Sequence, residues 1–148
     1  MTFTYSAEIK APIEKVYSFV TDPVNDTRWM KYVVFSKQMT APPYGVGTNV
    51  RHVFDALGQR TDIIWNVDQY EPPRLLTLSG ESDDVKVKGT LSLSPSATGT
   101  RIAMEAEATL KGFISVMEPL IRSHILPTIE GSIQTLRTLL ETENQNHH

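Results

Sequence analysis

Apolar and polar residues alternate along residues 2–9, with the aromatic and aliphatic side chains at the odd positions. A period of two is typical of a β-strand that has one face in the core and one face in water. Pro12 follows at a position that suits the first turn of a helix, and the next apolar residues recur at helical spacing. The pattern therefore predicts a strand over 2–9 and an amphipathic helix over about 12–21.

The pair Asp22-Pro23 combines a capping side chain with a proline in the first turn, and it predicts a second brief helix that ends near Arg28. Beyond it, short alternating segments are separated by proline and glycine. These segments predict six more strands, at 33–39, 48–56, 60–70, 74–79, 84–94 and 99–109. Because consecutive short strands joined by turns pair with their neighbours, we expect an antiparallel sheet.

The spacing of apolar residues changes to a helical period after Gly112. One apolar stripe then predicts a helix over about 118–142. Pro127 lies inside this helix and is expected to bend it, because proline lacks the N–H and crowds the carbonyl group four residues earlier. The long helix is the one predicted element that can cover the apolar face of the sheet, so the chain is expected to have an α+β fold.

Length and composition narrow the class of protein. The 148 residues are 40% hydrophobic and include no cysteine, which excludes disulfides and thiolate chemistry. We expect a single domain over 1–143 and a disordered polar tail at 144–148, whose terminal histidines match the remnant of a purification tag. With a net charge of −3, no basic cluster, no signal peptide and no long apolar run, the sequence predicts a cytoplasmic protein without nucleic acid binding or membrane insertion.

Motifs for cofactor chemistry are missing from the sequence. His52 and His124 are the only histidines before the tail and form no short-spaced ligand pair, so no metal site is expected. The glycine-rich motifs of dinucleotide and phosphate binding and the nucleophile elbow are also missing. The prediction is therefore a protein without a cofactor.

Strand parity gives a first estimate of the face that points to the helix. If Leu57-Gly58 is a two-residue turn, Ala56 lies opposite Gln59 and the register of the two strands is fixed. The more apolar face then carries Val50, His52, Phe54, Thr61, Ile63, Trp65 and Val67. The same parity places Met104 inward on the last strand, and it places charged residues such as Asp62 and Arg101 outward.

His52 is the polar exception on this inward face. A neutral imidazole can hydrogen-bond a ligand or act as an acid or base near pH 7, which makes His52 the candidate catalytic residue. The alternative is a structural histidine satisfied by a nearby backbone or tyrosine group. Parity places no second polar residue beside it, which weakens the catalytic interpretation. His124 has the same alternatives, since a helical histidine can also project from the edge of the apolar stripe.

Four segments, in this order, match the pattern of one family: IKAPIEKVYSFVTDPVNDTRWM, GVGTNV, YEPPRLLTLSG and TLRTLLE. Together they resemble the polyketide cyclase/dehydrase and lipid-transport family of the SRPBCC, or START-like, superfamily, over about residues 3–142. The resemblance implies a helix-grip fold, in which a curved seven-stranded antiparallel sheet wraps around a long C-terminal helix, with two short helices between strands 1 and 2. It also implies a deep apolar cavity, although members include carriers, enzymes and regulators.

The resemblance places an aromatic residue at the entrance of this cavity, where Trp29 falls in this sequence. Trp29 either plugs that entrance as structure or contacts a ligand there. Combined with parity and helical spacing, the resemblance predicts this ligand-binding set: Trp29, Tyr32, Val50, His52, Phe54, Ile63, Trp65, Met104, Phe113, Met117, Leu120 and His124.

Three functions are compatible with these predictions. The mostly apolar lining favours binding of a small hydrophobic or aromatic molecule, such as a lipid, polyketide or isoprenoid. The first alternative is a cyclase or dehydratase that folds a reactive chain in the pocket and uses His52 as acid or base. The second is a protein-binding role like that of the co-chaperone-related branch of the superfamily. Polar edge strands permit a homodimer without requiring one.

Overall fold

The computed structural model of the chain describes residues 1–56 and 58–145. The strands in this part of the chain are β1 (Thr2–Ile9), β2 (Val33–Gln38), β3 (Asn49–Ala56), β4 (Gln59–Glu71), β5 (Leu75–Glu81), β6 (Val85–Pro95) and β7 (Thr100–Leu110). The helices are α1 (Ile13–Val20), the 3-10 turn η1 (Pro23–Asn25), α2 (Asp26–Trp29), α3 (Gly112–Val116) and α4 (Glu118–Gln145).

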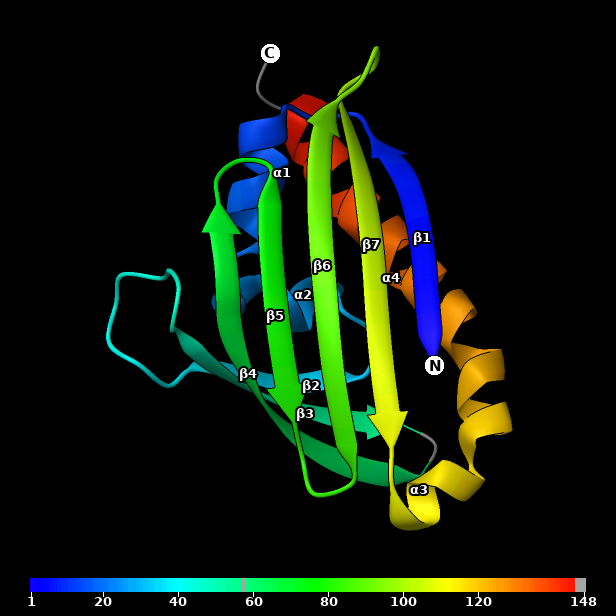
Figure 1. Ribbon diagram of the computed structural model, residues 1–148. Coiled ribbons are helices and arrows are strands. Elements are labelled where there is room, and N and C mark those ends of the chain that lie inside the picture. Colours follow the sequence, from blue (N-terminus) through cyan, green and yellow to red (C-terminus); the bar gives the residue numbers. More distant parts are fainter. Residues whose placement is uncertain (57, 146–148) are drawn as a thin grey trace.

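All seven of these strands form one antiparallel sheet in the order β1-β7-β6-β5-β4-β3-β2. The sheet is strongly curved, and α1, α2 and α4 lie on the same side of it (Figure 1). The predicted α+β architecture is confirmed, with its seven antiparallel strands, two short helical segments after β1 and a long C-terminal helix. Among the described residues, no helix combines the length and the apolar character that a membrane crossing needs.

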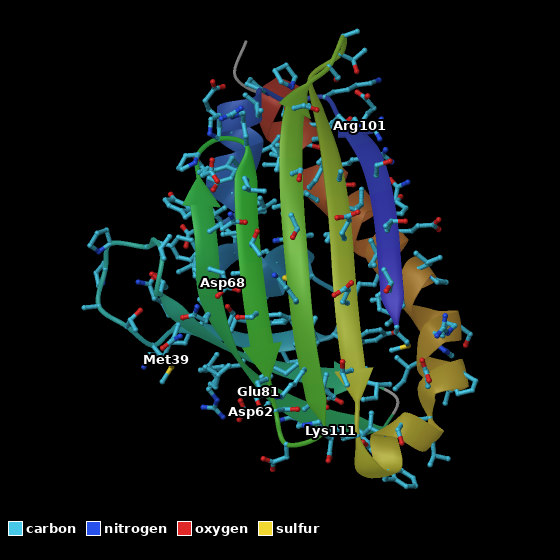
Figure 2. The ribbon with its side chains drawn as sticks, viewed as in Figure 1. Met39, Asp62, Asp68, Glu81, Arg101 and Lys111 are labelled. Carbon is cyan, nitrogen blue, oxygen red and sulfur yellow. The ribbon has the colours of Figure 1, made fainter. Side chains whose placement is uncertain are left out.

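The predicted pairing of β3 with β4 is confirmed, because Ala56 lies opposite Gln59 and His52 lies opposite Ile63. Leu57, the first residue of the predicted turn, lies outside the described residues. The outward positions are also as expected. Asp62 and Arg101 are exposed on the solvent side of the sheet (Figure 2), and Asp62 pairs there with Arg51 at 2.7 Å.

Two helical boundaries differ from the sequence prediction. The short helix α3 was not expected; it begins at Gly112, whose φ of 61° is a backbone conformation that favours glycine. The long helix α4 continues to Gln145, so the tail expected from residue 144 overlaps its last two residues, while 146–148 lie outside the described part. Figure 1 shows α4 as a bent helix, and Pro127 lies inside it.

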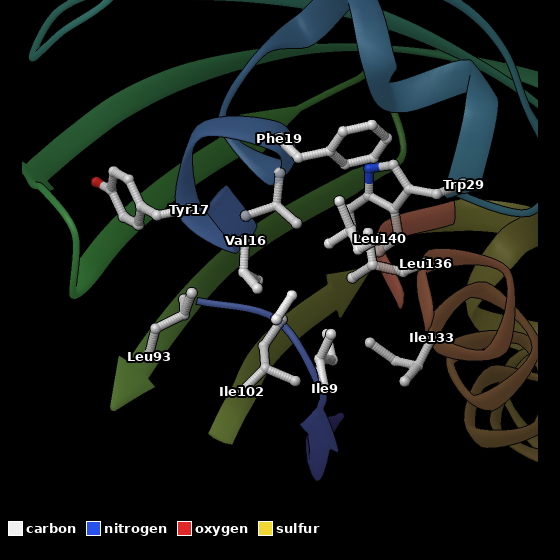
Figure 3. Packing of buried hydrophobic residues seen from close by; sticks show 12 residues of the cluster. Ile9, Val16, Tyr17, Phe19, Trp29, Leu93, Ile102, Ile133, Leu136 and Leu140 are labelled. Atoms are coloured by element: carbon white, nitrogen blue, oxygen red, sulfur yellow. The ribbon is translucent and has the colours of Figure 1, made fainter. Parts of the chain in front are cut away.

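The hydrophobic core lies at one end of the molecule, between α1, the C-terminal half of α4 and the strands β1, β6 and β7. The amphipathic helix α1 contributes Val16 and Tyr17, and α4 contributes Ile133, Leu136 and Leu140 (Figure 3). The earlier part of α4 contributes no fully buried residue among those described. This half of the helix therefore stands away from the sheet and leaves room beneath it.

Candidate functional site

The curved sheet and its helices enclose two adjoining apolar cavities. The first, called here the His52 cavity, has a volume of about 210 Å³ and lies between the inward face of the sheet and the segment from α1 to α2. The second, the α4 cavity, has a volume of about 430 Å³ and is lined by α3, the first half of α4 and the strand ends near them. Both are lined by Phe3, Met30, Trp65, Val87, Ala106 and Ile129.

Ten of the twelve residues predicted to bind a ligand line one of these cavities. The His52 cavity is lined by Trp29, Val50, His52, Trp65 and Met104. The α4 cavity is lined by Tyr32, Phe54, Ile63, Trp65, Met117 and His124. Their contact with a ligand stays a prediction. The residues on strands lie where parity predicts, whereas Trp29 and Tyr32 lie at the end of α2 and in the segment after it.

Phe113 and Leu120 line neither cavity, which corrects their predicted placement. Their side chains are 68% and 46% exposed. Phe113 is predicted to face the cavity from the start of the C-terminal region, but it lies in α3, a separate short helix that ends at Val116. Ile114 and Ile121 line the α4 cavity from this region instead.

His52 is 4% exposed, and both nitrogens of its ring are engaged. Its Nε2 lies 2.7 Å from Oδ2 of Asp26, and Trp65 Nε1 donates a hydrogen bond to its Nδ1 at 3.0 Å. An indole N–H can only donate, so Nδ1 must be the acceptor and the ring hydrogen must lie on Nε2, which donates to Asp26. His52 is thus a neutral imidazole with its one lone pair already in use, which supports the structural interpretation.

Asp26, the first residue of α2, is the polar partner of His52 that sequence reasoning missed. Its Oδ2 also accepts a hydrogen bond from Ser36 Oγ at 3.1 Å. Burial raises the pKa of this carboxyl group above its usual value of 3.8; the hydrogen bonds from His52 and Ser36 oppose this shift, and the negative charge of Asp22 adds to it. No described residue donates a hydrogen bond to Oδ1 of Asp26, and Asp26 lines the His52 cavity.

A signal for Asp26 was present in the sequence. Asp26 precedes Trp29 by three residues, and residues three apart on a helix share one face. If Trp29 faces the interior, Asp26 does so as well, and both line the His52 cavity. What the spacing could not provide was the partner, because His52 lies on a strand whose distance from α2 depends on the folded sheet.

Tyr44 adds a second unforeseen polar group to the same cavity. It lies in the loop between β2 and β3, and its ring packs edge-on against Tyr70 with the ring centroids 5.3 Å apart. Burial raises the pKa of its hydroxyl group, and the nearby negative charge of Asp26 raises it further. Among the described residues, none forms a hydrogen bond with this hydroxyl group, so it is available to a ligand.

A family model described as polyketide cyclase / dehydrase and lipid transport matches residues 1–141 of the chain. The chain belongs to this family. No curated protein matches the sequence. As members of the polyketide cyclase / dehydrase and lipid transport family are expected to do, the chain has the helix-grip architecture, and its family and fold are consistent with a domain that binds a hydrophobic ligand.

Solved structures share the fold of this family member at low sequence identity. A START superfamily protein from Mycobacterium smegmatis has a TM-score of 0.79 and 16% identity, over 95% of this chain and 97% of that one. A protein from Thermus thermophilus has a TM-score of 0.78 and 20% identity, over 97% and 99% of the two chains. A conserved protein from Geobacillus kaustophilus has a TM-score of 0.78 and 16% identity, over 96% of each chain. At these identities the likeness shows the fold alone.

Trp29 in this family member is both a core residue and part of the cavity wall. Its side chain is 6% exposed and belongs to the core cluster with Phe19, Leu136 and Leu140 (Figure 3). It also lines the His52 cavity, so the two interpretations of Trp29 do not exclude each other. Its indole N–H is buried and has no hydrogen-bond partner among the described residues.

The second indole, that of Trp65, depends on a glycine in the next strand. Trp65 lies opposite Gly80 of β5, and a Cβ atom at residue 80 would lie 2.5 Å from the indole ring. The missing side chain therefore allows the indole to lie close to β5 and to reach Nδ1 of His52. This local geometry completes the chain of hydrogen bonds from Trp65 through His52 to Asp26.

The chemistry that these groups can perform is limited. Metal binding has no candidate in the described part of the chain, where no three His, Asp or Glu side chains form a suitable group. His52 and His124 line different cavities, and Nδ1 of His124 is engaged with the carbonyl oxygen of Leu120 at 2.9 Å. The arrangement is an apolar chamber with one polar end, formed by Asp26, Tyr44 and His52.

Proposed function

We propose that the chain binds a small hydrophobic or aromatic molecule, such as a lipid, polyketide or isoprenoid, in the His52 cavity and the adjoining α4 cavity. The observation that carries the proposal is the lining, in which a nearly continuous apolar wall surrounds a few buried polar groups. Ligand pockets of proteins have this composition and volumes of roughly 300–1,000 Å³. The two cavities have volumes of about 210 and 430 Å³, so a ligand pocket that consists of both has a volume within that range.

Binding is favoured over catalysis by His52 because the hydrogen bond from Trp65 occupies Nδ1, the nitrogen that a general base would need. A base must hold a free lone pair near the proton that it removes. In this geometry His52 orients Asp26 and Trp65 and has no nitrogen to offer a substrate. The protein-binding alternative and the homodimer stay predictions.

Energy transfer from tryptophan to a bound probe tests the proposal. The chain has two tryptophans, and both line the His52 cavity. The neutral dye N-phenyl-1-naphthylamine absorbs where tryptophan emits, so excitation of the tryptophans should produce saturable dye emission if the dye enters the cavity. Wild-type protein without saturable emission would refute the proposal.

Two alanines of β7 provide a matched pair of variants for this assay. Ala106 lines both cavities, whereas Ala103 lies at the opposite parity on the outer face of the same strand. Ala106→Phe should fill the cavity and abolish dye binding, and Ala103→Phe should leave it unchanged. Far-ultraviolet circular dichroism checks that both variants are folded. Equal dye binding by the two variants would place the dye outside these cavities and contradict the proposal.

A second candidate function is catalysis of proton transfer by Asp26, in a cyclase or dehydratase type of reaction. It is favoured by one observation: Asp26 is a buried carboxyl group with a raised pKa and an Oδ1 atom that accepts no hydrogen bond from the described residues. Deuterium exchange at the acidic carbon of 2-tetralone, followed by NMR in D₂O, tests this activity. Faster exchange with wild-type protein than with Asp26→Asn supports it, and equal rates exclude it for this probe.

A further inference from the structure

We propose that the ligand of the His52 cavity carries a hydrogen-bond donor, such as a phenolic or aliphatic hydroxyl group, which binds between Asp26 and Tyr44, and that ligands with an anionic group at this place are rejected. The inference rests on the proposed function and specifies the class of ligand. It follows from which hydrogen-bonding atoms are already used, which remain available, and which charges surround them.

The available acceptor is Oδ1 of Asp26. The other oxygen of this carboxyl group, Oδ2, already accepts hydrogen bonds from His52 Nε2 at 2.7 Å and from Ser36 Oγ at 3.1 Å. These two donors fix the orientation of the carboxyl group of Asp26, which lines the cavity. The position of Oδ1 is therefore fixed as well. A donor on the ligand would give this acceptor a hydrogen bond, and hydrogen bonds to a charged group are stronger than those between neutral groups.

The available hydroxyl group belongs to Tyr44, which lines the same cavity. Asp26 lines that cavity too, and its negative charge contributes to the raised pKa of Tyr44. A ligand hydroxyl group can donate to Asp26 and accept from Tyr44 at the same time. Neither contact requires a change in the bonds that hold His52 and Trp65.

The charges around the cavity disfavour an anion. Asp26 is buried in its wall, and no lysine or arginine among the described residues lines it. Lys31 lines the α4 cavity and not this one. A carboxylate on the ligand would lose its hydration beside another carboxylate, without a cation to compensate it. Ligands whose polar groups differ in charge or in the ability to donate a hydrogen bond should therefore bind with different affinities.

Three probes with the same naphthalene ring system isolate the polar group. 2-Naphthol has a donor and an acceptor, 2-methoxynaphthalene has only an acceptor, and 2-naphthoate is an anion at pH 7. We expect isothermal titration calorimetry to show the tightest binding for 2-naphthol. 2-Methoxynaphthalene should bind at least about tenfold more weakly, and 2-naphthoate more weakly still, because a lost hydrogen bond to a charged group has about this effect.

Variants at the two polar residues test the placement. In Asp26→Asn, the donors from His52 and Ser36 keep the amide oxygen at the place of Oδ2, so the amide NH₂ group takes the place of Oδ1. Affinity for 2-naphthol should fall about tenfold while affinity for 2-naphthoate rises. Tyr44→Phe should weaken both neutral probes. Thr109→Val, which changes an exposed threonine of β7 that lines neither cavity, is the control and should leave the affinities unchanged.

Each outcome decides one of the two proposals. Equal affinities for 2-naphthol and 2-naphthoate, or a preference that survives both Asp26→Asn and Tyr44→Phe, would overturn the donor requirement and leave the binding function standing. If none of the three probes binds and N-phenyl-1-naphthylamine also fails, the binding function itself is overturned. Tyr44→Phe removes a hydroxyl group without a partner among the described residues, so it keeps the test decisive if Asp26→Asn does not fold.

Discussion

Replacing His52 by alanine tests whether the buried chain of hydrogen bonds stabilises the fold. The side chain is 4% exposed and connects α2 to two neighbouring strands, through Asp26 on one side and Trp65 on the other. Its loss leaves the carboxyl group of Asp26 with Ser36 as its remaining described donor. It also leaves the indole N–H of Trp65 without its acceptor.

The expected loss of stability is large for a single substitution. His52 is a neutral donor to Asp26 and an acceptor for Trp65, so its removal leaves two buried polar groups each without one partner, at a cost of about 1–3 kcal/mol for each group. We therefore expect His52→Ala to lower the free energy of unfolding by about 2–5 kcal/mol. The cost should fall by about 1–2 kcal/mol when Asp26→Asn is already present, since the uncompensated charge is then gone.

Urea denaturation followed by far-ultraviolet circular dichroism measures these differences without depending on the tryptophans. His124→Ala is the matched control, because His124 is exposed on α4, and its removal should change the free energy of unfolding by no more than about 0.5 kcal/mol. A loss below about 1 kcal/mol in His52→Ala, or an equal loss with and without Asp26→Asn, would refute the reasoning.

Three further substitutions probe the surroundings of the site. Gly80→Ala should move the indole of Trp65 out of hydrogen-bonding distance of His52 and destabilise the protein by about 1–3 kcal/mol, and an unchanged melting temperature would contradict this. Gly131→Ala should raise the melting temperature by about 2–4 °C, because alanine favours the helix and meets only the flexible end of Lys31; a lower melting temperature would mean that Lys31 cannot yield. Asp26 has a raised pKa when folded, so it contributes stability below its unfolded value of 3.8 that is lost as the pH rises through the folded value. We therefore expect the free energy of unfolding of wild type to fall relative to that of Asp26→Asn as the pH rises from about 4 to 7, as measured by denaturation at several pH values. A difference between the two free energies that does not change with pH would contradict the raised pKa.

The residues on the inward face of the sheet could be predicted because they depend on patterns within short segments of the sequence. Alternation of side chains has a period of two, and one turn position sets Ala56 opposite Gln59, which in turn places His52 opposite Ile63. The same reasoning brought Trp65 to the inner face. Strand parity thus identified the part of each cavity wall that the sheet contributes, such as Val50 and Met104 in the His52 cavity and Ile63 in the α4 cavity.

The polar end of the cavity could not be predicted in the same way. Asp26 and Tyr44 lie in segments where a polar or aromatic residue is ordinary, and their partners lie on other elements. Asp26 meets His52 only because η1 and α2 fold over the curved end of the sheet. Phe113 shows the opposite error, since it was assigned to the cavity although it lies in α3, a separate helix before α4. Contacts between distant elements depend on the curvature of the sheet, which no local pattern encodes.

The most direct test of the account is a crystal structure of the protein with 2-naphthol. The account predicts the naphthalene ring in the His52 cavity, with its hydroxyl oxygen within hydrogen-bonding distance of both Asp26 Oδ1 and the hydroxyl group of Tyr44. The bond between Trp65 and His52 should be unchanged. A naphthol molecule outside both cavities, or one whose hydroxyl group points away from Asp26, would contradict the account.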